Sequence, residues 1–374
     1  MSQFRRGLSL LALALCTSAV VGCGDSTGPG AGNLSDPAGL SADVQSLEAP
    51  LNAPAMQSFS AVALSSAGTP VARTVSMLAA LSPGGKLSAA GATEGQAYAL
   101  RALRPSLSLR PSFAVIPAEV WGKVYVWDEA SDQYVEGPGT GPANGVRFIL
   151  YAVNPLTQQP AEPVVEVGYA DFLDQSSGAT NSLRVQVVGG GTTYADYVVS
   201  GTSAASSFTA AADGYITDGT HRLDFTADLS ASGSQVSLDY ALSLDQPAIT
   251  AHLQLDLGFG GETATLTTSF AVTRGGETVV LAGTLTVTSN GQTSTLTANF
   301  SIQVNGGLFA TITAAASGGT AASYTVTGPG GRALTDAERE ALDRLFEAPS
   351  ELTELLDRVF HPVEAIFGEY TATL

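Results

Sequence analysis

Residues 263–289 read TATLTTSFAVTRGGETVVLAGTLTVTS, two runs of alternating apolar and polar residues on either side of Gly275-Gly276. Alternation with a period of two puts the apolar side chains on one face of a strand, and a Gly-Gly pair between such runs is typical of a tight hairpin turn. Seven runs of this kind fill the stretch from His221 to Ser317. The stretch therefore predicts an antiparallel β-meander with one apolar face and one polar face.

Each turn also predicts which residues face each other on neighbouring strands, because a tight turn fixes the register of its hairpin. A one-residue slip would move every apolar side chain to the wrong face, so agreement between turns and apolar positions is a specific signal. The predicted pairs are Phe270 with Leu281 and Val272 with Val279 across Gly275-Gly276, Leu229 with Val236 across Ser232-Gly233, Leu257 with Ala264 across Gly260-Gly261, Leu285 with Leu296 across Asn290-Gly291, and Phe300 with Ile312 across Asn305-Gly306-Gly307.

Two helices are predicted after the meander. Thr335 and Glu338 have the spacing of a capping box, which opens a helix with Leu342, Leu345 and Phe346 on one stripe. Pro349 interrupts it, and a second stripe follows with helical spacing: Leu352, Leu355, Leu356, Val359 and Phe360. Both helices need a surface to cover, and the apolar face of the sheet supplies one.

The apolar face is larger than these helices. Seven strands about 4.8 Å apart present roughly 1,200 Å², whereas two short helices cover roughly 400 Å². A row of small residues, which includes Thr268 and Gly283, predicts either a bend or a groove. We therefore expect a mainly β fold with flanking helices, a curled sheet or half-barrel with the C-terminal helices on its apolar face. Either residues 41–118 cover the remainder, or an apolar ligand lies in a hollow lined by Leu253, Leu255, Leu266, Phe270, Leu281, Leu285, Leu296 and Phe300, under a movable lid formed by helices within residues 342–360.

The chain opens with Arg5-Arg6, an apolar run from Leu8 to Val21, and Val20-Val21-Gly22-Cys23. The run is too short to span a membrane and ends in small residues, which indicates a secretory signal peptide. The four residues ending at Cys23 resemble the lipobox of bacterial lipoproteins, although Val20 stands where leucine is commonest. The resemblance covers only the start of the chain. It implies cleavage before Cys23, lipidation of that residue and a membrane-anchored protein, whereas an ordinary signal peptide followed by a coincidental cysteine is the alternative.

The expected domain organisation follows from the composition along the chain. Residues 1–22 form the signal peptide, 23–40 a flexible Gly/Ser/Pro-rich tether, and 41–374 a single β-rich domain. Within the domain we expect a mixed region at 41–118, an antiparallel sheet at 119–328 and helices at 334–370. The sheet would begin with shorter strands at 119–127, 134–136, 146–153, 164–171, 183–188 and 194–200. Because Gly24 rather than an aspartate follows Cys23, the pattern favours the outer membrane, on its periplasmic side or at the cell surface.

Charge and cysteine content limit the kinds of binding partner and of covalent cross-link that the protein can have. The chain has 34 acidic and 16 basic residues, a formal net charge of −18, which argues against nucleic acid as a partner. Cys16 lies in the predicted signal peptide, so Cys23 would be the one cysteine left and no disulfide is expected. The membrane is the partner that the lipobox implies, and the sequence does not identify any protein partner.

Candidate chemistry is sparse, and we predict no catalytic residue, metal or cofactor. His221, His252 and His361 lack metal-ligand spacing. The glycine-rich segment 137–145 lacks the Lys-Ser/Thr of a phosphate loop, and Ser203 lacks the second glycine of a nucleophile elbow. Asp213-Gly214 and Asp218-Gly219 fit turns between strands. Four aspartates are expected as solvated carboxylates on the polar face of the sheet: Asp224, Asp228, Asp239 and Asp256.

Two interpretations from different functional classes remain. In the first, a tethered, non-catalytic lipoprotein binds a lipid or another apolar molecule in a curled sheet, an architecture that resembles the lipid-carrier lipoproteins without sharing a motif with them. In the second, the sheet is a packed structural or adhesive scaffold of the cell envelope with no small-molecule ligand. Trp121, Tyr125 and Trp127, expected on one face of a strand, would form either a stacking platform for a flat ligand or ordinary packing.

Overall fold

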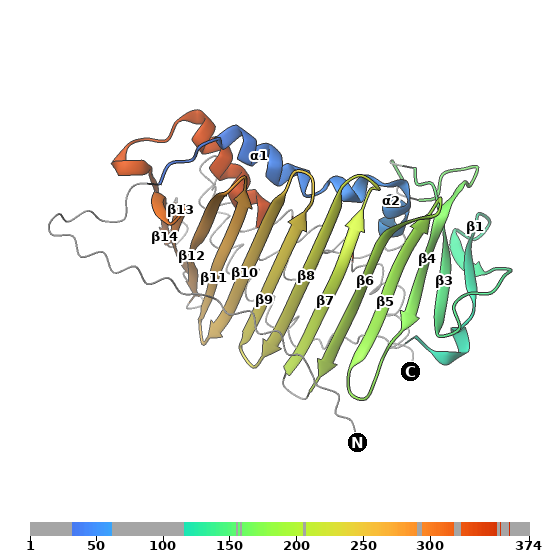
Figure 1. Ribbon diagram of the computed structural model, residues 1–374. Coiled ribbons are helices and arrows are strands. Elements are labelled where there is room, and N and C mark those ends of the chain that lie inside the picture. The colour runs from blue at the N-terminus through green and yellow to red at the C-terminus, as the bar shows by residue number, and fades with distance from the viewer. Residues whose placement is uncertain are drawn as a thin grey trace, which may run out of the picture.

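A computed structural model describes residues 32–61 and 116–349, apart from short gaps at 155, 158, 205–206, 290–293 and 318–322, together with residues 352 and 359. The described residues form one 15-stranded sheet that follows the chain from β15 back to β3, with β1 next and β2 at the far edge (Figure 1). Neighbouring strands are antiparallel apart from β1 and β3, which pair in parallel. At about 4.8 Å per strand, the sheet is about 67 Å wide.

The strands lengthen toward the middle of the sheet. They are β1 (Val124–Asp128), β2 (Gln133–Glu136), β3 (Gly145–Tyr151), β4 (Glu166–Asp174), β5 (Asn181–Gly189), β6 (Thr192–Ser203), β7 (Ser207–Thr217), β8 (Arg222–Ser232), β9 (Gln235–Leu244), β10 (Ile249–Gly260), β11 (Thr263–Arg274), β12 (Glu277–Ser289), β13 (Ser294–Val304), β14 (Gly307–Ser317) and β15 (Ser323–Thr327). The helical elements are α1 (Pro37–Ser46), η1 (Ala49–Asn52), α2 (Pro54–Ala61), η2 (Ala118–Val120), η3 (Pro329–Gly331) and residues 336–349.

The predicted meander is confirmed, since its seven strands are β8 to β14 and their apolar side chains share one face. The pairs Phe270 with Leu281, Val272 with Val279 and Phe300 with Ile312 are correct. The other three hairpins are shifted by two residues. In these, Leu229 faces Leu238, Leu257 faces Leu266 and Leu285 faces Ala298. A two-residue shift keeps every side chain on its predicted face.

The shift has a cause in turn geometry. A two-residue hairpin turn needs a positive φ at its first position, which favours glycine there. Gly233 and Gly261 take that first position with φ of 57° and 60°, whereas the predicted register had put them second. Gly275-Gly276 was predicted correctly, because there both turn residues are glycines with positive φ. The turn at 290–293 lies outside the described residues.

Three other expectations about the sheet were wrong. The sheet is open, because its outer strands β15 and β2 do not pair, and it is not strongly curled, so it is no half-barrel (Figure 1). The predicted strand at 119–127 is a 3-10 turn followed by β1, which starts at Val124. Strand β7 was not predicted, and Asp213-Gly214 lies inside it rather than in a turn. The middle of β7, residues 210–214, consists of alanine, aspartate and glycine, which interrupts the alternation of strand-forming side chains.

The N-terminal segment 32–61 covers part of the apolar face. The Gly32 amide donates to the carbonyl oxygen of Leu308 on β14 at 3.0 Å, and Asp36 and Asp43 bind Arg274 at the end of β11. Figure 1 shows α1 and α2 following one another across the strands. At the other end, α2 packs on β3 to β6, where Phe59 lies 6.1 Å from Phe172 between ring centroids. Residues 32–40, which the sequence assigned to the tether, therefore pack on the sheet, and Asp36 caps α1.

The predicted helix after the meander spans residues 336–349, with Leu342, Leu345 and Phe346 fully buried. The capping box is confirmed, because the Glu338 amide donates to Thr335 Oγ1 and the Thr335 amide donates to Glu338 Oε2. Phe346 packs edge-on against Phe300 of β13 at 5.7 Å, and farther along the chain the carbonyl of Val359 accepts from the Tyr197 hydroxyl on β6. The C-terminal segment thus contacts the same apolar face at two distant strands.

The capping box predicts a pH-dependent contribution to stability. The hydrogen bonds from Arg332, with those from Thr335, lower the pKa of Glu338 from 4.5 to about 2. A carboxyl whose pKa is lower in the folded state stabilises the fold above pH 4.5 and loses that contribution as the pH falls toward 2. We expect Glu338→Gln to cost about 1 kcal/mol at pH 7, because Arg332 is partly exposed and its ion pair is screened.

The measurement is the free energy of unfolding in urea at pH 7 and pH 3, with Glu340→Gln on the exposed side of the same helix as the control. The difference between Glu338→Gln and the native protein should shrink at pH 3. An equal difference at both pH values would contradict the role assigned to the carboxylate charge.

Candidate functional site: the polar face of the sheet

The eight residues predicted to line an apolar hollow lie together in the hydrophobic core, on the apolar face of β10 to β13. None is more than 5% exposed. The chain itself buries this face, and the same core includes residues of segment 32–61 and of helix 336–349, among them three residues of the predicted lid, Leu342, Leu345 and Phe346. Two buried hydroxyls on the same face, Tyr240 Oη and Thr268 Oγ1, have no hydrogen-bond partner in the described part of the chain. Burial raises the pKa of Tyr240 well above its usual value.

The predicted aromatic row does not form a platform. Trp121 precedes β1, is 41% exposed, and its indole nitrogen donates to the carbonyl of Ile116. Tyr125 stacks on Phe148 with 5.0 Å between ring centroids, and Trp127 packs edge-on against Tyr134 at 5.5 Å. Tyr125 and Trp127 therefore serve packing between β1, β2 and β3.

Two hollows among the described residues open on the polar face. The larger one, which we call the long hollow, has a volume of about 830 Å³ and is lined from β5 to β10. Most of its charged and aromatic side chains come from strands that were predicted to be short, or from β7, which was not predicted. They are Arg184 of β5, Asp196 of β6, Asp213 and Tyr215 of β7, Arg222 and Asp224 of β8, and His252 of β10.

These side chains line up because cross-strand register places them side by side. Asp196 faces Tyr215, and Tyr215 faces Asp224 on the next strand. Arg184 holds Asp196 with two hydrogen bonds of 2.8 and 2.7 Å. Arg222 binds Asp224 in the same way, and its guanidinium carbon lies 3.6 Å from the centre of the Tyr215 ring. The floor of the long hollow is thus a row of fixed hydrogen-bonding groups.

The electrostatics of the row follow from these pairs. The hydrogen bonds from Arg184 are the main reason that the pKa of Asp196 is below its usual value, and a hydrogen bond from Gln186 adds to this. Asp224 is likewise paired with Arg222, which raises the pKa of that guanidinium. The lowered pKa keeps Asp196 ionised beside Arg184, and Arg222 forms an ion pair with Asp224.

The smaller hollow, the short hollow, has a volume of about 410 Å³ and is acidic. Asp228, Asp239 and Asp256 line it without a lysine or arginine, and Asp228 directly faces Asp239 across the strands. Burial raises the pKa of Asp239, but hydrogen bonds from Gln254 and His252 outweigh it and leave that pKa low. In the described ranges, no group of three or more His, Cys, Asp or Glu side chains could hold a metal ion.

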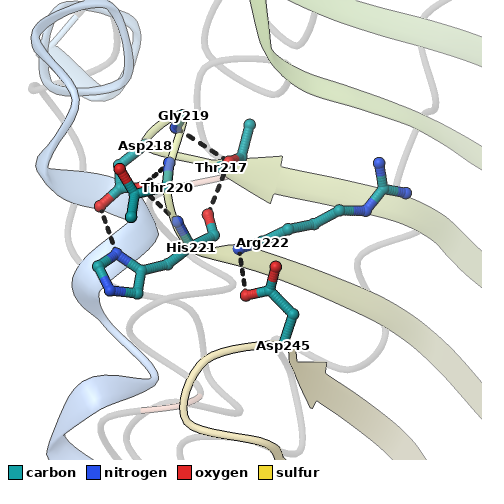
Figure 2. Close-up of polar contacts among 7 residues, drawn as sticks. All are labelled: Thr217, Asp218, Gly219, Thr220, His221, Arg222 and Asp245. Atoms are coloured by element: carbon teal, nitrogen blue, oxygen red, sulfur yellow. Dashed lines mark hydrogen bonds and ion pairs between the residues drawn. The ribbon is translucent and has the colours of Figure 1, made fainter.

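The turn between β7 and β8 holds a histidine and a carboxylate (Figure 2). Asp218 accepts hydrogen bonds from the amides of Thr220 and His221, and its other oxygen lies 2.8 Å from His221 Nδ1. Burial alone would raise the pKa of Asp218, but these hydrogen bonds lower it. The Thr217 hydroxyl donates to the carbonyl of His221 rather than to the imidazole ring. The contacts stabilise the turn predicted at Asp218-Gly219 and place no nucleophile beside the histidine.

The glycine-rich loop and the four aspartates predicted on the polar face lie where the sequence placed them. Residues 137–144 form a loop between β2 and β3, as expected, and the four aspartates at 224, 228, 239 and 256 are on the polar face. Cys23 and His361 lie outside the described residues, as does the side chain of Ser203. In the part of the chain that the structure describes, each helix is too short or too polar to cross a bilayer.

No family model, curated protein or solved structure matches the chain. The two faces of the sheet, one buried and one polar, are therefore the features that bear on function.

Proposed function

We propose that the protein is a lipid-anchored, non-catalytic scaffold of the bacterial cell envelope, with the polar face of its sheet as the recognition surface. One contrast supports this proposal. The apolar face, where a lipid would have to lie, is buried, with segment 32–61 and helix 336–349 in the same hydrophobic core, whereas the polar face carries the long and short hollows. Because apolar and polar residues alternate along each strand, the polar face has few apolar side chains and does not need to be covered by other parts of the chain.

The proposed anchor would hold one edge of the sheet near the membrane. Gly32 is bonded to Leu308 at the outer edge of β14, beyond the part of that strand that pairs with β15. The stretch between Cys23 and Gly32 can span at most about 30 Å. The sheet is about 67 Å wide, so β1 and β2, at its other end, can stand well away from the membrane. In this orientation the polar face is not pressed against the bilayer and is free to bind a partner.

Cys23→Ser tests the anchor. We expect the variant to incorporate no labelled fatty acid and to leave the membrane fraction, because the thiol that accepts the lipid is gone. The measurement is acyl labelling followed by fractionation of cells, with Cys16→Ser in the predicted signal peptide as the matched control. Fatty-acid incorporation into Cys23→Ser would contradict the lipoprotein assignment.

A second candidate function, the binding of an apolar molecule, is favoured by the two unpartnered hydroxyls on the apolar face. Buried polar groups are nearly always hydrogen-bonded, so each exception needs a reason. A bound lipid or other apolar molecule with one polar group could supply a partner for Tyr240 or Thr268, which face Leu253 and Leu255 of the predicted lining on neighbouring strands. The burial of that lining by the chain itself weighs against this candidate.

A further inference from the structure

The long hollow has the shape of a site for a chain-like ligand. It is lined by six consecutive strands, β5 to β10, which corresponds to about 24 Å across the sheet. Its volume of about 830 Å³ is that of a ligand site of ordinary size. A volume of this size spread over such a length describes a long, shallow trough rather than a deep pocket. A linear polymer lying across the strands fits it better than a compact molecule.

The groups along this trough recognise hydroxyls rather than charges. Arg184 with Asp196, and Arg222 with Asp224, are neutralised pairs, so they offer no net charge to an ionic ligand. Each pair still presents lone pairs and N–H groups in a fixed geometry, and ionised partners form the stronger hydrogen bonds. Thr226 of β8, Ser243 of β9 and Thr250 of β10 add hydroxyls to the lining. Fixed donors and acceptors side by side suit the adjacent hydroxyl groups of a sugar.

The short hollow provides the contrast. Three aspartates with no arginine or lysine make it negatively charged, and salt would screen the binding of a charged ligand there. The long hollow has one carboxylate, that of Asp213, with no hydrogen-bond partner among the described residues. It lies on β7, in the middle of the trough. That carboxylate can accept hydrogen bonds from two hydroxyls of a ligand without displacing an internal partner.

We propose that the long hollow binds a neutral, linear carbohydrate chain laid across strands β5 to β10. This inference rests on the proposed function, because it names the ligand class of the recognition surface. Asp213 accepts hydrogen bonds from the sugar, and the two arginine–aspartate pairs hold the chain on either side of it.

The test uses the full chain with Cys23→Ser, so that binding is measured in solution. The probes are neutral β-1,4-linked and α-1,4-linked glucose oligomers and N-acetylglucosamine oligomers of increasing length, titrated by calorimetry at low and high salt. We expect at least one series to bind with an affinity that rises with length and is insensitive to salt. Asp213→Ala should weaken that binding about tenfold, the effect of losing a hydrogen bond to a charged group.

Asp228→Ala is the matched control, because Asp228 is also exposed, also without a partner among the described residues, and lies on the neighbouring strand in the short hollow. It should leave the affinity unchanged. Absence of binding to all three series, or equal losses in the two variants, would overturn the proposal. Binding restricted to the cationic, deacetylated glucosamine oligomer and abolished by salt would also overturn it. None of these results bears on membrane attachment, which the Cys23 labelling experiment decides separately.

Discussion

Phe346→Ala should lower the free energy of unfolding by about 3 to 5 kcal/mol, the usual cost of removing a large aromatic side chain from a packed core. Phe346 is fully buried and lies edge-on against Phe300, so its loss leaves a cavity between helix 336–349 and β13. Neighbouring helix residues Leu342 and Leu345 are also fully buried, which restricts how far the helix can move to fill that space. The measurement is equilibrium unfolding in urea.

The control for this variant is Glu340→Ala, on the exposed side of the same helix. It should change stability by no more than about 0.5 kcal/mol. If the helix were instead a lid that opens readily, both substitutions would have similar small effects. Equal losses below about 1 kcal/mol would show that the helix contributes little to the core.

Gly283→Leu should destabilise the protein by about 3 kcal/mol, at the upper end of what overpacking costs. Gly283 faces Phe300 across β12 and β13, and a Cβ at this position would collide with the carbonyl oxygen of Asn299 and with the Phe300 ring. Gly214 has the same relation to Tyr197 on β6. At both glycines, the aromatic ring of the neighbouring strand also contacts the C-terminal segment, so a larger side chain disturbs the sheet and its cover together.

The control is Thr286→Val on the polar face of the same strand, where the side chain faces Thr265 and Thr297. This change should stay within about 0.5 kcal/mol. Negligible losses at both positions, measured by thermal and urea unfolding, would mean that the packed face of β12 has been assigned to the wrong side.

The meander could be predicted because period-two alternation and glycine turns are local signals. Register was predicted correctly at Gly275-Gly276, where both glycines lie in the turn, but was two residues off at Gly260-Gly261, where only Gly261 does. Glycines in the sequence therefore locate a turn but leave two placements of its register open. The open shape of the sheet was not predictable from strand patterns. That shape depends on how much of the apolar face the rest of the chain covers. Part of this cover was not predicted, because residues 32–40 have the composition of a flexible tether although Asp36 caps a helix there.

The candidate site was harder to predict than the fold. Arg184, Asp196, Tyr215 and Arg222 belong to strands separated by turns and lie together only through cross-strand register. No spacing in the sequence brings them together. Strand β7, which carries Tyr215, is interrupted at residues 210–214 by alanine, aspartate and glycine, so its strand signal is weak. The apolar residues proposed for ligand binding were placed on the correct face. Alternation shows which side chains share a face but not what covers it.

Native mass spectrometry of the purified Cys23→Ser protein, before and after solvent extraction, tests most directly whether the chain fills its own apolar face. We expect the mass of the polypeptide alone and a thermal unfolding midpoint that extraction does not change. A non-covalent lipid at about one molecule per chain, lost on extraction together with stability, would contradict the scaffold and establish the apolar face as a binding site.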